Sequence, residues 1–333
     1  MKFSLIICTY MRPNSILDLL NSILSQTSYP DQILIIDGST NDLTKVAVLK
    51  DDFRNLTYYA VPPQEKGLTK QRNFGISKVS QSSEIVCFLD DDTVLKSDYF
   101  EQVFQTYKIH PEALGVGGYI TNETQWANVG KCYQPKINEF YFDDWKRADG
   151  SRFVLRKKLG LDSNCPPGYS SLFSHGRSVG FLPPTGKIYE VEQLMGGVSS
   201  FRKKVFDSIQ FSTYFEGYGL YEDADFSLRI AKKGKLFLNT AAQLAHNHEP
   251  SGRPNQYQYG KMVVRNGWYV WRVKNPNPFI RDKFKWHTIT ILLTVIRFSN
   301  TFTTPNKKAA FTEALGRFVG WWSLFFNKPS SNE

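Results

Sequence analysis

The chain has 333 residues, of which 41% are hydrophobic and 22% charged, so it can hold one large α/β domain or two smaller domains. Its four cysteines are scattered without a CxxC pair, which argues against a disulfide framework or a zinc site and favours a reducing compartment. The sequence has no apolar stretch of about 20 residues to span a membrane, and no charged and then apolar signal region precedes the first expected strand.

The net charge of +10 comes entirely from the last quarter of the chain. Residues 251–333 contain 13 Lys and Arg but 3 Asp and Glu, whereas residues 1–250 contain 28 of each kind. A basic block of this kind predicts an anionic partner, such as lipid headgroups, a phosphorylated acceptor or nucleic acid.

Apolar runs of strand length alternate with helical periodicity in the first third of the chain. Strands are expected at 3–8, 32–36, 56–61 and 85–89, with helices after residue 14, near 41 and over 67–79. This order predicts an α/β fold with a doubly wound, mostly parallel, Rossmann-like sheet. Farther along, a helix is expected near 97–108 and short strands near 115–121, 235–239 and 241–245, and residues 198–202 form another short apolar piece.

Three carboxylates follow the fourth strand directly, at Asp90, Asp91 and Asp92. Ligands of open α/β sheets bind outside the carboxyl ends of the strands, so these acids are expected at a ligand crevice. Adjacent carboxylates repel one another unless a cation lies among them, and oxygen ligands suit Mg²⁺ or Mn²⁺. An acidic turn that caps a helix is the alternative.

A second acidic cluster starts an expected helix at Glu222 and Asp223. A carboxylate at a helix start can project into a cleft and act as a general base, although acidic helix starts are common. Asp225 and Arg229 are four residues apart, which favours a structural ion pair.

Residues 122–187 lack helical or strand periodicity, as is typical of functional loops.

Two histidines, His246 and His248, follow the last expected strand, and either could add a nitrogen ligand to the Asp cluster.

Beyond residue 255 aromatic and basic residues alternate, and apolar runs occupy 286–296 and 318–326. These runs are too short to cross a bilayer but have the composition of interfacial membrane helices. Packing on the core or self-association, as in a homo-oligomer, is the alternative.

Seven short segments, taken in chain order, resemble motifs of the family 2 glycosyltransferases, which have a GT-A fold. The pieces are 6–13, 36–39, 67–68 with 72–75, 89–92, 195–197, 222–225 and residue 246. The resemblance covers residues 1–250 and implies a nucleotide-sugar-binding half (1–121) and an acceptor and catalytic half (122–250). Residues 251–333 match no motif of the family and are expected to form a C-terminal helical extension. It also implies inverting transfer from a nucleotide-diphosphate sugar, of which a UDP-sugar is the first expectation.

The same resemblance implies a role for each matching residue. The residues expected to bind the donor are Thr9, Tyr10, Arg12, Asp37, Arg72, Asp90 and Asp91. Asp92 and His246 are expected to bind the metal, and Asp223 to act as the catalytic base with Glu222 beside it. Gly196, Gly197 and Glu222 are expected to contact the acceptor. One acid, Asp37, precedes Gly38-Ser39 where the family often has two, so the partner of Asp37 is open.

These patterns predict a metal-dependent transferase that acts on a saccharide or lipid-linked saccharide in cell-surface polysaccharide biosynthesis. The expected location is cytoplasmic, peripheral on the inner face of the membrane, and no nucleic-acid partner is expected. A nucleotidyltransferase would use similar acids and a cation, but the sequence lacks a glycine-rich basic loop for a triphosphate. A non-catalytic nucleotide- or membrane-binding module is the third hypothesis.

Overall fold

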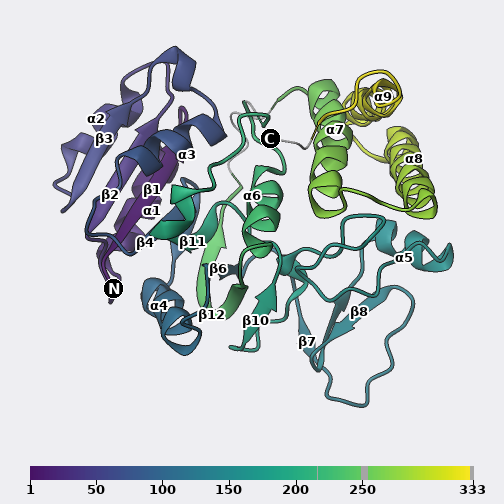
Figure 1. Ribbon diagram of the computed structural model, residues 1–333, viewed down its shortest axis with the longest axis horizontal. Helices are drawn as coiled ribbons and strands as arrows, with labels where there is room; N and C mark the ends of the chain where they lie inside the picture. The colour runs from purple at the N-terminus through teal and green to yellow at the C-terminus, as the bar shows by residue number, and fades with distance from the viewer. Residues whose placement is uncertain (216, 249–253, 331–333) are drawn as a thin grey trace. The chain divides into compact units, whose positions relative to one another are not determined.

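A computed structural model describes residues 1–215, 217–248 and 254–330 of the chain (Figure 1). The chain forms two compact units, each built from two stretches of sequence. The first unit comprises residues 1–124 and 179–252, and the second comprises residues 125–178 and 253–333. The expected boundary at residue 250 lies outside the described residues.

A nine-stranded sheet forms the centre of the described part of the first unit. The strands are β1 (Phe3–Thr9), β2 (Gln32–Asp37), β3 (Leu56–Ala60), β4 (Ile85–Asp90), β5 (Thr93–Leu95), β6 (Gly115–Ile120), β10 (Ile188–Val191), β11 (Val198–Arg202) and β12 (Leu236–His246). Their order is β10-β12-β6-β11-β4-β1-β2-β3, and β5 pairs with β12. β3, β2, β1 and β4 are mutually parallel, which confirms the predicted doubly wound half.

Helices cover both faces of this sheet. They are α1 (Pro13–Leu24), α2 (Leu43–Lys50), α3 (Leu68–Ser77), α4 (Tyr99–Ile109) and α6 (Glu222–Ala231), with single 3₁₀ turns at Pro63–Glu65, Val179–Phe181 and Lys203–Asp207. Alternate residues of each strand point to opposite faces. Leu5, Ile7 and Ile33 pack in one core with the buried stripe of α1 and with α4, whereas Ile6 and Ile36 contact α3 at Gly75.

Two details of the sheet differ from the pattern in the sequence. β11 is antiparallel to both of its neighbours, β4 and β6. β12 is one strand of 11 residues where two short strands were expected, because the chain continues through an irregularity between Leu238 and Gln243. The result is that β12 extends far enough to bring His246 opposite Thr93 of β5.

The second unit contains a small antiparallel sheet and the C-terminal helices. Its elements are β7 (Ala127–Asn128), β8 (Glu139–Phe142), β9 (Trp145–Ala148), α5 (Ser151–Lys158), α7 (Gln256–Lys274), α8 (Ile280–Thr303) and α9 (Lys307–Ser323). Residues 125–178, expected to belong with residues 1–250, instead pack with the C-terminal helices. α5 contacts α8, and Trp271 Nε1 donates a hydrogen bond to the Leu172 carbonyl at 3.0 Å.

Tryptophans form the core between these C-terminal helices. Trp268 and Trp271 of α7 pack with Trp286 of α8 and with Leu324. α7 and α9 approach so closely that a Cβ on Gly316 would lie 2.1 Å from the Tyr257 carbonyl oxygen. The predicted C-terminal helices are therefore present and form a packed bundle (Figure 1).

Candidate functional site

The predicted donor-binding residues lie where three adjacent parallel strands end. Thr9 at the end of β1 pairs in register with Asp37 at the end of β2, and Cys8 pairs with Asp90 at the end of β4. Because parallel strands end at the same edge of a sheet, these side chains are brought together by the strand order. Tyr10 follows β1 at this edge and is 45% exposed.

Asp37 is buried and held by two donors. Its Oδ1 accepts a hydrogen bond from the Ser39 backbone N–H at 2.7 Å, and its Oδ2 accepts one from the Tyr58 hydroxyl at 2.6 Å. Tyr58 lies on β3, the strand next to β2, and the sequence analysis did not identify it. Both oxygens are thus fixed in orientation at the strand edge.

A buried glutamine that the sequence analysis missed joins β1 to β2. Gln71 of α3 donates from Nε2 to the Thr9 carbonyl at 3.2 Å and to the Ile36 carbonyl at 2.8 Å. Its Oε1 accepts from the Gly67 N–H at the start of the same helix. Gln71 therefore fixes α3, and with it Arg72, against the ends of the two strands.

Asp91 is turned into the protein, although its two neighbours face the site. It is 3% exposed and accepts hydrogen bonds from Thr9 Oγ1 at 2.7 Å and from Arg12 Nη1 at 2.9 Å. Burial raises the pKa of the Asp91 carboxyl to about 6, and the Arg12 charge opposes this rise. Asp91 thus positions Thr9 and Arg12, two of the predicted donor-binding residues.

Asp90, Asp92 and His246 form a group that can hold a divalent cation. One ligand atom from each residue lies within 4.8 Å of the others. His246 Nε2 is 3.0 Å from Asp92 Oδ1, and the Asn247 N–H donates to the Asp92 carbonyl at 2.9 Å. Two carboxylates and one imidazole are a suitable donor set for a hard or borderline divalent metal.

The carboxylates around His246 shift the pKa of its imidazole. Burial alone lowers this pKa, but hydrogen bonding to Asp92 and Glu123 and the nearby carboxylate charges raise it to about 10. A cation bound to Asp92 would compete with the imidazole proton. Ligation by the imidazole requires loss of this proton.

His248 makes a different contact from His246. Its Nε2 lies 2.9 Å from Glu123 Oε1, and Glu123 Oε1 is also 3.5 Å from His246 Nδ1. Glu123, His246 and His248 form a second group whose ligand atoms lie within 4.8 Å of one another. Sequence analysis did not identify Glu123, because its partners His246 and His248 lie more than 120 residues away along the chain.

Arg72 connects the Asp cluster with the acids at the start of α6. Its Nη1 lies 2.5 Å from Glu222 Oε1, and its Nη2 lies 3.5 Å from Asp90 Oδ1. Burial raises the pKa of Glu222 to about 8 although the Arg72 charge opposes the shift. Among the described residues, Glu222 Oε2 is buried and has no hydrogen-bond partner.

Gly196 and Gly197 allow these charged groups to approach the backbone. A Cβ on Gly197 would lie 2.0 Å from the Asp90 carboxyl, and a Cβ on Gly196 would lie 2.6 Å from both Arg72 Nη1 and Glu222 Oε1. Any side chain at either position would therefore displace a site residue. The acceptor contacts expected for these glycines stay a prediction.

Asp223 is anchored by two backbone donors at the start of α6. Its Oδ2 accepts from the Gly196 N–H at 3.2 Å, and its Oδ1 accepts from the Ala224 N–H at 2.8 Å. Burial raises the pKa of Asp223 above the usual value for aspartate, and these hydrogen bonds oppose the rise. The predicted structural pair on the same helix is confirmed, with Arg229 Nη2 2.7 Å from Asp225 Oδ2.

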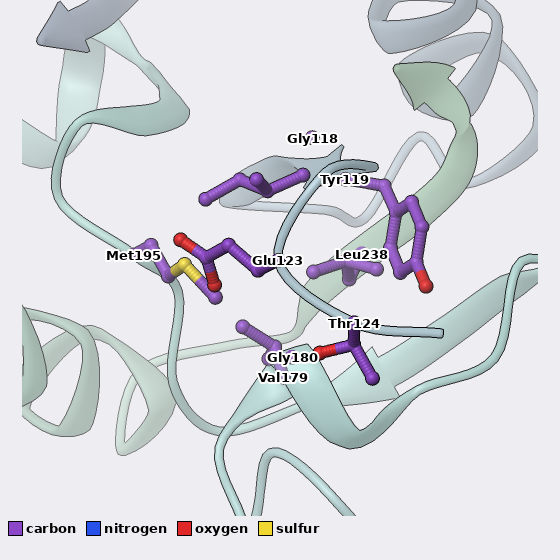
Figure 2. Close-up of a pocket in the computed structure, with 9 residues that line it drawn as sticks. Gly118, Tyr119, Glu123, Thr124, Val179, Gly180, Met195 and Leu238 are labelled. Atoms are coloured by element: carbon purple, nitrogen blue, oxygen red, sulfur yellow. The ribbon is translucent and has the colours of Figure 1, made fainter. Parts of the chain in front are cut away.

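A pocket adjoins this site within the first unit (Figure 2). Its lining residues are Gly118, Tyr119, Ile120, Glu123, Thr124, Val179, Gly180, Met195 and Leu238. Figure 2 shows the Glu123 carboxylate beside the Met195 side chain. Met195 directly precedes Gly196-Gly197, and Glu123 contacts His246, so the pocket borders both parts of the site.

Comparisons with known proteins agree with this arrangement. The profile described as "Glycosyl transferase family 2" matches residues 4–171, about half of the chain. A "Glucosyl-dolichyl phosphate glucuronosyltransferase" of Haloferax volcanii is 28% identical over 147 residues, which are 43% of this chain and 44% of the relative. The "O-antigen chain rhamnosyltransferase RfbN" of Salmonella typhimurium is 30% identical over 95 residues, 28% of this chain and 29% of the relative.

Both alignments thus span less than half the length of the curated relatives. Among solved structures, "GalNAc-T7 with UDP, GalNAc and Mn2+" superposes on 81% of this chain and 50% of its own chain, with a TM-score of 0.52 and 14% identity. That likeness concerns the fold. With the family profile, the strand-end acids and the described sheet, it follows that this chain belongs to glycosyl transferase family 2 and has the GT-A fold.

Proposed function

We propose that this protein is an inverting glycosyltransferase that moves a sugar from a nucleotide-diphosphate sugar to a hydroxyl of a saccharide or lipid-linked saccharide. The observation that supports this most is the connection through Arg72 of the strand-end acid Asp90 to the α6 acid Glu222, beside the anchored Asp223. Acids that could bind a cation and an acid that could act as a base are thereby parts of one site.

Asp223 is the proposed general base. In a single displacement, the acceptor oxygen forms a bond to the anomeric carbon while the bond from that carbon to the diphosphate oxygen breaks. The electron pair leaves with the diphosphate, and the hydroxyl proton passes to Asp223. A carboxylate with a raised pKa is a better base than an ordinary aspartate, because proton transfer to it is less unfavourable.

Glu222 and the glycine pair are proposed to face the acceptor. Glu222 Oε2 has no partner within the described residues and can accept a hydrogen bond from an acceptor hydroxyl. Glu222 lies next to Gly196, since a Cβ on that glycine would lie 2.6 Å from Glu222 Oε1.

The donor is proposed to bind along the strand ends. Thr9, Tyr10, Arg12 and Asp37 would hold the nucleoside, and Arg72 would reach the ribose or the diphosphate. Asp90 and Asp92 with His246 would hold Mg²⁺ or Mn²⁺, which as a Lewis acid stabilises the negative charge that develops on the leaving diphosphate. UDP is the proposed nucleotide.

A place in cell-surface polysaccharide biosynthesis is proposed from the names of the relatives. One of them is named for a dolichyl-phosphate-linked sugar and the other for an O-antigen chain. Within the described residues, the helices do not combine the length and apolarity needed to cross a membrane. Separately, the basic and aromatic composition of residues 251–333 supports a proposed peripheral position on the inner face of the cell membrane.

Transfer of labelled sugar from a panel of UDP-, dTDP-, GDP- and CDP-sugars, with Mn²⁺ and extracted glycolipid acceptors, tests the proposal. Asp223→Asn should abolish transfer while the thermal shift with the matching nucleoside diphosphate is retained. The exposed Asp207 of the same unit provides the control, and Asp207→Asn should keep full activity. Turnover by Asp223→Asn would refute the assignment of the base, and pyrophosphate release from a nucleoside triphosphate would indicate a nucleotidyltransferase.

A further inference from the structure

The two last helices, which belong to the second unit, present an apolar surface to which the proposed reaction assigns no role. On α8 the exposed residues Ile280, Phe284, Ile291, Val295, Phe298 and Phe302 recur every three, four or seven positions, so they share one helix face. On α9, Phe311, Leu315, Phe318 and Trp322 recur in the same way, and in the turn after it Phe325 and Phe326 lie three and four positions after Trp322. We call these two rows together the aromatic stripe.

The two rows meet to form one surface. The rings of Phe298 on α8 and Phe311 on α9 have centroids 6.1 Å apart, and Trp322 contacts both Phe325 and Phe326. Several members are largely exposed, including Phe284 at 72% and Phe302 at 73%. Contiguous exposed apolar surface of this kind marks an interaction site rather than ordinary surface variation.

The net charge of the second unit indicates which kind of partner would cover the aromatic stripe. The second unit has 22 Lys and Arg and 8 Asp and Glu, whereas the first unit has 19 and 23. Their net charges are therefore +14 and −4. In the described residues 254–330 the acids are Asp282 and Glu313, and they are 3% and 4% exposed. Within residues 254–330, the surface around the stripe thus carries exposed bases and no exposed carboxylate.

The exposed bases lie near the ends of both rows. They are Arg281 and Lys283 at the start of α8, Lys307 and Lys308 at the turn into α9, and Lys328 after α9. Apolar and aromatic residues on one helix face, flanked by bases, are typical of helices that lie in the interface of an anionic bilayer. A second copy of this chain is less suitable, because it would place one basic unit against another.

We propose that the aromatic stripe inserts into the surface of a membrane that contains anionic lipids, with α8 and α9 parallel to the bilayer plane. Phe284, Phe302 and Trp322 would enter the boundary between headgroups and acyl chains, while the flanking bases contact lipid phosphates. The inference extends the proposed membrane location by naming the surface, but it does not require the sugar-transfer reaction to be correct.

Flotation of the full chain with vesicles tests this proposal without any donor or acceptor. We expect binding to phosphatidylcholine vesicles that contain phosphatidylglycerol, weaker binding to phosphatidylcholine alone, and release at high salt. Phe284→Asp and Phe302→Asp should each weaken vesicle binding about tenfold or more, because each replaces a phenylalanine that would be buried in the bilayer with a charged side chain. Lys307→Glu with Lys308→Glu should weaken it about fivefold per base lost.

A matched control is available on the first unit. Val46 of α2 is 64% exposed and lies outside the stripe, so Val46→Asp should bind vesicles as the wild type does. Far-UV circular dichroism and thermal unfolding of the variants check that all of them fold. Equal binding by Phe302→Asp and the wild type overturns the proposal. So does a dimer that Phe302→Asp converts to a monomer in the absence of vesicle binding, because the second copy would then cover the stripe.

Vesicle binding and sugar transfer give separate outcomes. A chain that floats with anionic vesicles but transfers no sugar retains the membrane inference and refutes the proposed function. A chain that transfers sugar to a soluble acceptor but does not float refutes the membrane inference alone. Loss of both in one stripe variant that remains folded would show that activity depends on membrane attachment.

Discussion

Arg72 Nη1 lies 2.5 Å from Glu222 Oε1, and both side chains are buried although 150 residues separate them in the sequence. The same guanidinium lies 3.5 Å from Asp90 through Nη2. One cation therefore compensates two acids that come from different motifs. Its position depends in turn on Gln71, which fixes α3 to the ends of β1 and β2.

Replacement of Arg72 by methionine should destabilise the protein. Arg72→Met leaves Glu222 buried beside an apolar side chain, and removal of one partner of a buried ion pair lowers the free energy of unfolding by about 3–5 kcal/mol. Urea denaturation followed by tryptophan fluorescence measures the change. Lys45→Met, at an exposed lysine of α2 in the same unit, should change it by less than about 0.5 kcal/mol.

The double variant Arg72→Met/Glu222→Leu separates stability from function. Because the second change removes the isolated carboxylate, the double variant should recover much of the lost stability. It should remain inactive, since neither Asp90 nor the acceptor would have its polar partner. A double variant no more stable than Arg72→Met would contradict the ion-pair explanation.

Gly197 should tolerate no side chain. In Gly197→Ala the new methyl group would lie 2.0 Å from the Asp90 carboxyl, so Asp90 must leave its place in the proposed metal group. We expect a loss of Mn²⁺ affinity of about tenfold or more, measured by electron paramagnetic resonance of free Mn²⁺. Gly150 has a φ of −68° and open space around its Cβ position, so Gly150→Ala should bind Mn²⁺ as the wild type does.

As the pH is lowered, the enzyme should lose activity at a higher pH than it would if its base had the pKa of an ordinary aspartate. Burial raises the pKa of Asp223 above 3.8, and only the ionised form can take the acceptor proton. The acid limb of kcat/KM should therefore have its midpoint above pH 3.8, with activity rising as the pH increases through it. A profile that stays flat down to pH 3.8 would show that Asp223 does not act as the base with a raised pKa.

The strand-end acids could be predicted because local sequence determines them. Each of β1, β2 and β4 is an apolar run that ends in polar residues, and parallel order alone brings Thr9, Asp37 and Asp90 to one edge. The amphipathic stripe of α1 is equally local. Such features need no knowledge of the rest of the chain.

Contacts across long sequence separations could not be predicted in the same way. Tyr58, Gln71 and Glu123 hold site residues through side-chain geometry, and nothing in the residues next to them indicates this. The grouping of residues 125–178 with the C-terminal helices depends on packing such as that of Trp271 against Leu172. Aperiodic, aromatic-rich sequence carries little information about its partners.

The choice between His246 and His248 as a metal ligand rests on one geometric difference. His246 Nε2 lies 3.0 Å from Asp92 Oδ1, whereas His248 Nε2 contacts Glu123. His246→Ala should therefore lower Mn²⁺ affinity by about tenfold or more, because it removes a nitrogen donor from the Asp90–Asp92 group. His248→Ala should change the affinity by less than about threefold. Titration of both variants with Mn²⁺, followed by resonance of the free ion, decides between them, and a larger loss for His248→Ala would assign the ion to the Glu123 group.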